Sequence, residues 1–247
     1  MGDRMGHSEG ATARSTAHSG FRRDPAAVNS EAVEDYAKAI HALHERDGTA
    51  VSTSALAERL GVSPGSVTAM LKRMVDMGLV VHEPYHGVTL TGPGERVALE
   101  VIRHHRLLEA YLSEALGMPW DRVHDEAEVL EHYISEELEE RIAAALGDPS
   151  FDPHGDPIPD RALEVEEAEG VALARLEPGA AGTFTRVSDS DPAMLRYLAE
   201  RGIRPGARLQ VRERQPFGGP LTIEVDGAGH AIGGALAERM VVTLARG

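Results

Sequence analysis

The sequence predicts a multidomain, mainly helical fold that ends in a small β-barrel, and three observations predict it. A helix-turn-helix pattern near the N-terminus is followed directly by a hairpin pattern. Two long helical patterns occupy the middle of the chain. Short strand patterns separated by turns occupy the last third. The 247 residues are enough for several domains, each with its own core.

The N-terminal part begins with residues 1–28, which are rich in small and polar residues without periodicity, so we expect a disordered tail there. Apolar residues then recur every three to four positions from Ser30 to Asp47, which predicts a first helix. A second helix is expected over residues 54–60 and a third over residues 64–74.

A three-residue turn containing Gly61 separates the second and third helices, which is typical of a helix-turn-helix. Residues 79–83 and 88–91 predict a hairpin. Together they predict a winged-helix DNA-binding domain over residues 29–97, and the alternative is a three-helix domain without nucleic acid. The candidate DNA contacts lie on the third helix or just before it: Ser63, Pro64, Ser66, Thr68, Lys72 and Arg73.

Residues 98–163 are expected to form a helical domain around two long helices, predicted over residues 95–116 and 121–146. The second helix carries a continuous apolar stripe that is wide enough for a dimer interface: Val123, Ala127, Leu130, Ile134, Leu138 and Ile142. A proline-rich segment, residues 152–159, then interrupts regular structure, and the acidic residues 164–169 predict a linker.

Residues 164–247 are expected to form the small β-barrel. Its strands are predicted over residues 171–176, 182–187, 208–213, 221–225 and 240–244, with one short helix over residues 191–201.

A metal-binding pattern lies in the second long helix, in the segment V-H-D-E-A-E-V-L-E-H. Glu128, Glu131 and His132 are spaced i, i+3 and i+4, so a helix projects all three from one face. Neighbouring carboxylates repel each other unless a cation or proton lies between them, and imidazole is a transition-metal ligand. A divalent metal site is the simplest interpretation of this pattern, and a solvated acidic helix face with a chance histidine remains the alternative.

The charge distribution agrees with a cation-binding middle domain. Residues 99–163 carry 5 Lys and Arg against 16 Asp and Glu, for a net charge of −11. Residues 1–98 and residues 164–247 each carry 10 against 12, for −2. The N-terminal domain is therefore close enough to neutral to approach a phosphate backbone.

Two absences from the sequence narrow the function. The chain has no cysteine, which excludes disulfides, thiolate-ligated metals and cysteine nucleophiles. No apolar run approaches the roughly 20 residues that span a bilayer, and the N-terminus lacks the apolar core of a signal peptide. We therefore expect a cytoplasmic protein with no membrane partner.

The chain resembles the metal-dependent repressors of the diphtheria-toxin-repressor and manganese-transport-regulator family. The resemblance covers about residues 30–247 and rests on the winged helix, V-H-D-E-A-E-V-L-E-H, P-H-G-D-P-I-P and R-G-I-R-P-G. It implies a helical metal-binding and dimerisation domain and a C-terminal SH3-like domain of the ferrous-transport-accessory type. It also implies a metal-activated homodimer that binds palindromic double-stranded DNA operators of metal-homeostasis genes, with no small-molecule substrate.

Carried over to this chain, the resemblance implies a primary metal site of Asp35, Glu128, Glu131 and His132. Iron-type members have Met and Cys at the first two positions, whereas manganese-type members have carboxylates, as here. Hard oxygen ligands suit Mn(II), so we expect Mn(II) as the cofactor. Fe(II) is the alternative, and Co(II) or Zn(II) is expected to bind in vitro.

The resemblance also implies an ancillary site of His105, Glu109, His124 and Asp191, whereas His154 is expected to be structural. Lys38 stands where two-domain manganese-type members have a glutamate that helps to hold a second ion, which argues against a paired-metal site. Met194 falls where iron-type members have a glutamine ligand.

Two other classes of function remain open at this point. A carboxylate-and-histidine metalloenzyme of the di-iron type requires Glu-x-x-His on two helices, and the sequence has no second copy. A winged-helix regulator could instead respond to a non-metal ligand, with the acidic cluster solvated.

Overall fold

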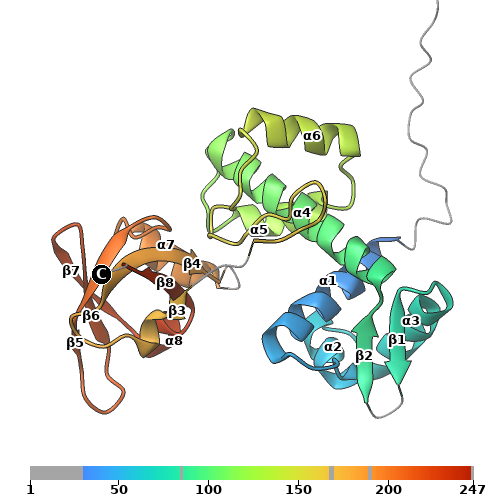
Figure 1. Ribbon diagram of the computed structural model, residues 1–247, viewed down its shortest axis with the longest axis horizontal. Coiled ribbons are helices and arrows are strands. Elements are labelled where there is room, and N and C mark those ends of the chain that lie inside the picture. Colours follow the sequence, from blue (N-terminus) through green and yellow to red (C-terminus); the bar gives the residue numbers. More distant parts are fainter. Residues whose placement is uncertain (1–29, 84–85, 167–169, 189–190, 246–247) are drawn as a thin grey trace, which may run out of the picture.

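The computed structural model describes residues 30–83, 86–166, 170–188 and 191–245. The predicted disordered tail lies outside these residues, as do parts of the predicted hairpin turn and of the acidic linker. Figure 1 shows three groups of elements in chain order: a winged helix, a helical domain and a β domain. Among the described helices, none combines the length and the apolar character needed to cross a membrane.

The N-terminal domain has the predicted winged-helix architecture. Three helices precede a two-stranded hairpin: α1 (Ser30–Asp47), α2 (Thr53–Leu60), α3 (Pro64–Asp76), β1 (Val80–Glu83) and β2 (Gly87–Leu90). The helices share one apolar core that includes Ile40, Leu56 and Leu71. Ser63 caps α3, because its side chain accepts a hydrogen bond from the backbone N–H of Ser66.

The helical domain is built on α4 (Gly92–Glu114), which starts next to the hairpin and continues into the middle of the molecule (Figure 1). A Cβ at Gly94 would lie 1.9 Å from the carbonyl oxygen of Leu79, so only glycine allows α4 this close to the hairpin. Two shorter helices follow, α5 (Val123–Leu130) and α6 (Glu136–Ala145).

The prediction of one continuous helix over residues 121–146 is wrong. Helix α5 ends at Leu130, and α6 begins after its N-cap Ser135, whose side chain accepts a hydrogen bond from the backbone N–H of Leu138. An N-cap serine followed by acidic residues favours a new helix start. The break also divides the predicted apolar stripe. Four of its residues are buried (Val123, Ala127, Ile134 and Ile142), whereas Leu130 and Leu138 are exposed.

The C-terminal domain is an antiparallel sheet of order β3-β8-β4-β5-β6-β7 with short helices. Its elements are β3 (Val171–Ala172), the 3-10 helix η2 (Leu173–Arg175), β4 (Ala181–Val187), α7 (Pro192–Ala199), β5 (Arg208–Arg214), β6 (Leu221–Val225), β7 (Ala228–Ile232), α8 (Gly234–Ala237) and β8 (Met240–Leu244). The sequence did not predict β7 or α8. The strand expected over residues 171–176 is shorter, because the chain turns into η2.

The loop at residues 152–156 joins the helical domain to the β domain. Gly155 has a φ of +86°, and a Cβ there would lie 1.8 Å from the carbonyl oxygen of Thr185 on β4. The backbone N–H of Val187 donates to the carbonyl of His154 at 2.9 Å. The ring of His154 stacks on Trp120, which is buried in the core of the β domain. The hydrogen bond from Val187 and the stacking on Trp120 hold His154 beside α4.

Candidate metal centre

Asp35, Glu131 and His132 converge where α1 meets the turn after α5. Each offers one ligand atom, and these atoms lie within 4.8 Å of one another. His132 Nε2 lies 3.2 Å from Asp35 Oδ1 and 3.5 Å from Glu131 Oε1. Glu131 is fully buried and His132 nearly so. One buried carboxylate, one partly exposed carboxylate and a nearly buried imidazole grouped this closely fit a divalent metal ion.

Glu34 supports His132 from the other side of the ring. Its Oε2 lies 2.7 Å from His132 Nδ1. Hydrogen bonds first to Asp35 and then to Glu34 raise the pKa of His132 to about 10. A carboxylate at the second ring nitrogen is typical of metal-binding histidines, because it fixes the tautomer and the ring orientation. The sequence analysis missed Glu34, whose spacing from Asp35 gives no local signal.

Glu128 lies outside the group of Asp35, Glu131 and His132. It clusters with His105 and Glu131, again with ligand atoms within 4.8 Å. The ammonium of Lys38 contacts this group and donates to Glu128 Oε1 at 2.5 Å. Lys38 also donates to both oxygens of Glu131, at 2.8 and 2.9 Å. The four predicted primary residues are therefore neighbours, but they do not form one common group.

The predicted ancillary residues His105, Glu109 and His124 form a third group. His105 Nε2 lies 3.0 Å from Glu109 Oε1 and 3.1 Å from His124 Nδ1. Burial lowers the pKa of His105, but hydrogen bonds to Glu109 and Glu131 outweigh it and raise the pKa. Burial raises the pKa of Glu109, yet its histidine partners hold that pKa well below the ordinary value.

Asp152 and His154 add a fourth group around Glu109. Glu109 Oε2 and His154 Nδ1 lie 3.4 Å apart, and neither atom has a hydrogen-bond partner among the described residues. Burial raises the pKa of Asp152 well above its ordinary value, and Asp156 and Glu109 add to this. Sequence reasoning did not include Asp152 or His154 in the site, because they reach Glu109 only through the fold of the 152–156 loop.

Asp191 lies outside these four groups. Its carboxylate caps α7 by accepting from the backbone N–H groups of Ala193 and Met194. Its assignment to the ancillary site stays a prediction.

A buried polar network holds the turn that carries Glu131. His104 Nδ1 lies 3.1 Å from the carbonyl oxygen of Glu131, and His104 Nε2 lies 3.1 Å from Glu139 Oε2. Arg103 donates to the same Glu139 carboxylate and to the carbonyl of Pro159. The helix break after Leu130 is therefore tied to both α4 and α6.

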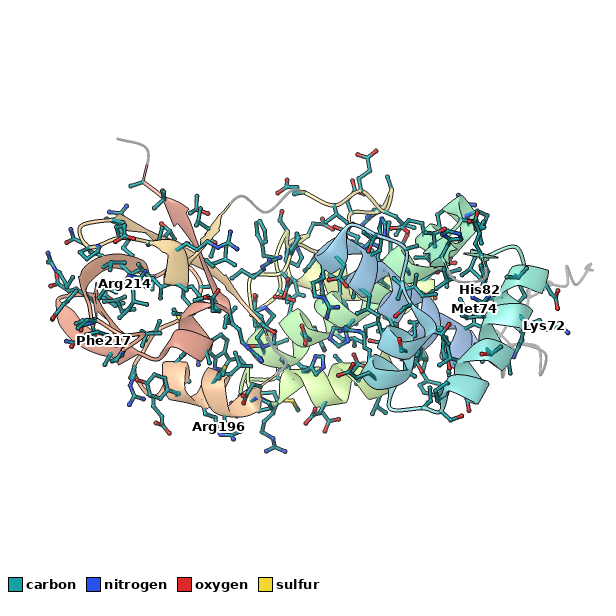
Figure 2. The ribbon with its side chains drawn as sticks, turned by 90° about the horizontal axis from the view of Figure 1, so that it is seen from below. Lys72, Met74, His82, Arg196, Arg214 and Phe217 are labelled. Carbon is teal, nitrogen blue, oxygen red and sulfur yellow. The ribbon has the colours of Figure 1, made fainter. Side chains whose placement is uncertain are left out.

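The predicted DNA contacts lie on the outer face of α3. Its inner face buries Val67, Leu71 and Met74. Lys72 is exposed and Arg73 is half-buried. Figure 2 shows Lys72 at the opposite end of the molecule from Arg214 and Phe217 of the β domain. The other four residues are also exposed: Ser63, Pro64, Ser66 and Thr68.

Three segments of the chain match known families. Residues 29–88 match the iron dependent repressor, N-terminal DNA binding domain, and residues 91–160 match its metal binding and dimerisation domain. Residues 171–244 match the FeoA domain. These matches agree with the winged-helix, helical and SH3-like domains described above.

Individual relatives give the same result. The chain is 33% identical over 209 residues to the iron-dependent repressor IdeR of Mycobacterium tuberculosis, covering 80% of this chain and 90% of that protein. Among solved structures, it is similar to a manganese-dependent transcriptional repressor in complex with manganese. That likeness has 43% identity and a TM-score of 0.80, and covers 86% of this chain and 100% of the other. The manganese regulator SloR is 32% identical, with a TM-score of 0.68 and coverage of 86% and 98%. The chain therefore belongs to the iron-dependent repressor family, and it is a metal-dependent, DNA-binding transcriptional repressor and not an enzyme.

Proposed function

We propose that this protein is a Mn(II)-activated homodimeric repressor that binds palindromic operators of metal-homeostasis genes in the cytoplasm. The observation that carries the proposal is the group formed by Asp35, Glu131 and His132, which offers only oxygen and nitrogen ligands. Such ligands suit Mn(II), whereas thioether and thiolate ligands favour later metals. Two similar solved structures are described as manganese regulators, while the curated relative is named iron-dependent, so Fe(II) is the alternative.

The proposed activation follows from the positions of these residues. Asp35 lies on α1 of the winged helix, whereas Glu131 and His132 lie in the helical domain. A bound ion supplies positive charge that neutralises the carboxylates of both domains. Glu34 orients His132, and Asp35 ties α1 to the helical domain. Because α1, α2 and α3 share one core, fixing α1 also fixes the orientation of α3.

The proposed dimer uses the apolar residues that α5, α6 and the turn between them leave exposed: Val129, Leu130, Tyr133 and Leu138. A two-fold dimer places two copies of α3 about one DNA turn, roughly 34 Å, apart, as a palindromic operator requires. The helical domain would then hold the dimer face and the metal site on the same short elements.

A second ion is proposed at His105, Glu109 and His124. The buried side chains of Glu109, Asp152 and His154 support a cation at this position, because their ligand atoms lie within 4.8 Å of one another. Asp152 and His154 are better candidates than Asp191 for completing its ligands, since they already cluster with Glu109.

The test is operator binding by chelator-treated protein, titrated separately with Mn(II), Fe(II), Co(II) and Zn(II) at matched free-metal concentrations. DNA binding should be metal-dependent, and Glu131→Ala should weaken Mn(II) activation by at least about 100-fold, because it removes a direct ligand. Glu126→Ala, which changes an exposed glutamate on α5, is the matched control and should respond normally. Metal-independent binding by the unaltered protein would contradict the proposal.

The same titration tests the choice of Mn(II) over Fe(II). The double variant Asp35→Met, Glu128→Cys replaces two hard oxygen donors by softer sulfur donors. Its response to Mn(II) should fall relative to its response to Fe(II) or Co(II). An unchanged order of metals would mean that these two residues do not set the selectivity.

A further inference from the structure

Tyr133 contacts the winged helix from the turn between α5 and α6. Its hydroxyl donates to Glu31 Oε1 at 2.7 Å, and the two residues are 102 positions apart in the chain. Glu31 lies in the first turn of α1. This hydrogen bond therefore joins the helical domain directly to the DNA-binding domain.

The hydrogen bond does not use the proposed metal ligands. In the proposed site, the side chains of Asp35, Glu131 and His132 turn to the ion. Glu31 is not a member of any of the four groups of candidate ligands found among the described residues. The bond between Tyr133 and Glu31 can therefore form both with and without a bound ion.

The position of Glu31 on α1 gives this bond a mechanical role. Glu31 and Asp35 are spaced i, i+4, so they project from the same face of α1, about 6 Å apart along the helix axis. A single tie at Asp35 leaves α1 free to tilt about that point, whereas a second tie at Glu31 opposes the tilt. Because α1, α2 and α3 share one core, a tilt of α1 also moves α3.

The ring of Tyr133 also belongs to the proposed dimer face. Tyr133 is 66% exposed and lies close in the chain to the exposed residues Val129 and Leu130. Tyrosine suits a double role, because its ring packs on apolar surface while its hydroxyl forms a hydrogen bond. A partner subunit packed on the ring would restrict its rotation and hold the hydroxyl toward Glu31.

We propose that Tyr133 is a positioning residue that links the dimer interface to the DNA-binding domain through Glu31. The link holds α3 at the angle that DNA requires, so it raises DNA affinity without changing metal affinity. This inference rests on the proposed dimer and adds to the metal site a second tie between the two domains.

The test measures DNA binding by the full-length protein at saturating Mn(II). The probe is a duplex that the unaltered protein selects from a random pool. Tyr133→Phe keeps the ring and removes the hydroxyl. Glu31→Ala removes the acceptor, and Glu31→Gln loses the same charge but keeps an acceptor oxygen. Tyr197→Phe is the matched control, because it removes a hydroxyl that donates to the carbonyl of Ala231 within the β domain at 2.6 Å.

Tyr133→Phe should weaken DNA binding roughly fivefold, as expected for the loss of one hydrogen bond. Glu31→Ala should be weaker than Glu31→Gln by a similar factor. The double variant Tyr133→Phe, Glu31→Ala should lose no more than Glu31→Ala alone, because both changes remove the same bond. Tyr197→Phe should bind DNA like the unaltered protein.

Two further measurements separate positioning from a merely structural role. Calorimetry on chelator-treated Tyr133→Phe should give an unchanged Mn(II) affinity, and sedimentation should show an unchanged dimer. Normal DNA binding by Tyr133→Phe would overturn the inference, as would additive losses in the double variant or a loss of Mn(II) affinity in Tyr133→Phe. A monomeric unaltered protein at saturating Mn(II) would contradict the proposed dimer itself, and the link with it.

Discussion

The helical domain buries polar and charged side chains as well as apolar ones, whereas the core of the β domain is apolar. Among the described residues, the buried polar and charged side chains all fall between residues 103 and 154: Arg103, His104, His105, Glu109, Glu131, His132, Asp152 and His154. The β domain core is apolar throughout and includes Phe184, Ile223 and Met240. Burying charge is costly unless each charge has a partner, whereas apolar burial stabilises without one.

Because of this difference, the stability of the β domain should depend on other residues than the metal binding of the helical domain. The β domain is held by packing, so its stability should respond to changes in side-chain volume. The helical domain is held by charge compensation in addition to apolar packing, so its stability should also respond to protons, cations and the removal of single partners. Three predictions test this separation, in decreasing order of expected effect.

The largest effect is expected from Phe184→Ala in the β domain. Phe184 is fully buried, so the variant should lose about 3–5 kcal/mol of unfolding free energy in that domain. Mn(II) binding at Asp35, Glu131 and His132 should remain unchanged, because those residues lie in other domains. Thermal unfolding and calorimetry measure the two effects.

Phe217→Ala is the matched control for this prediction. Phe217 is the other phenylalanine of the same domain and is fully exposed on the β5–β6 turn. Its removal should change stability by less than about 0.5 kcal/mol. A large loss of primary-site Mn(II) affinity in Phe184→Ala would show that the two regions are not separate.

A smaller effect is expected from Glu139→Gln on α6. Burial raises the pKa of Glu139, but His104 and Arg103 outweigh it and lower the pKa. Loss of these charge-assisted hydrogen bonds should cost about 1.5 kcal/mol near neutral pH. A carboxylate with a lowered pKa stabilises the fold above its ordinary value of 4.5 and loses this effect as pH falls through its folded value.

The stability difference between the unaltered protein and Glu139→Gln should therefore shrink below pH 4.5. Denaturant unfolding at several pH values measures it. Glu137→Gln, which changes an exposed glutamate on the same helix, should have little effect at any pH. An identical loss in both variants would show that α6 does not depend on the buried network.

The smallest of the three expected effects is the change in Mn(II) affinity for each pH unit. Hydrogen bonds to Asp35 and Glu34 raise the pKa of His132 to about 10, so a metal must displace its proton at neutral pH. Mn(II) affinity should rise about tenfold per pH unit between about pH 6.5 and 8.5, equivalent to about 1.4 kcal/mol.

The contribution of His132 to folding stability has the opposite pH dependence, because it decreases as pH rises. Its protonated ring stabilises the folded protein fully below its unfolded pKa of about 6.5, and this is lost as pH rises through about 10. Chelator competition at several pH values measures the metal affinity. An affinity that does not change with pH would argue against His132 as a ligand.

Much of the architecture was predictable because its signals are local. The helix-turn-helix pattern around Gly61 and the hairpin pattern after it predicted the winged helix, which the structure and the family match confirm. The break in the second long helix was missed, although Ser135 followed by acidic residues is a helix-start signal. The apolar residues keep helical spacing across the break, and this pattern predicted one continuous helix. Short β7, with its small residues, gave too weak a pattern.

The sequence by itself determined which residue types were available for the metal: carboxylates and imidazoles at helical spacing, and no cysteine. Only the tertiary structure decided how they are grouped. Lys38 reaches Glu128 across 90 residues, and Glu34 reaches His132 across 98. Such pairs depend on how α1, α4 and α5 pack, and periodicity within one helix carries no information about its partner. The packing therefore groups Asp35, Glu131 and His132 together and places Glu128 in a second group that shares Glu131, and Lys38 contacts both glutamates.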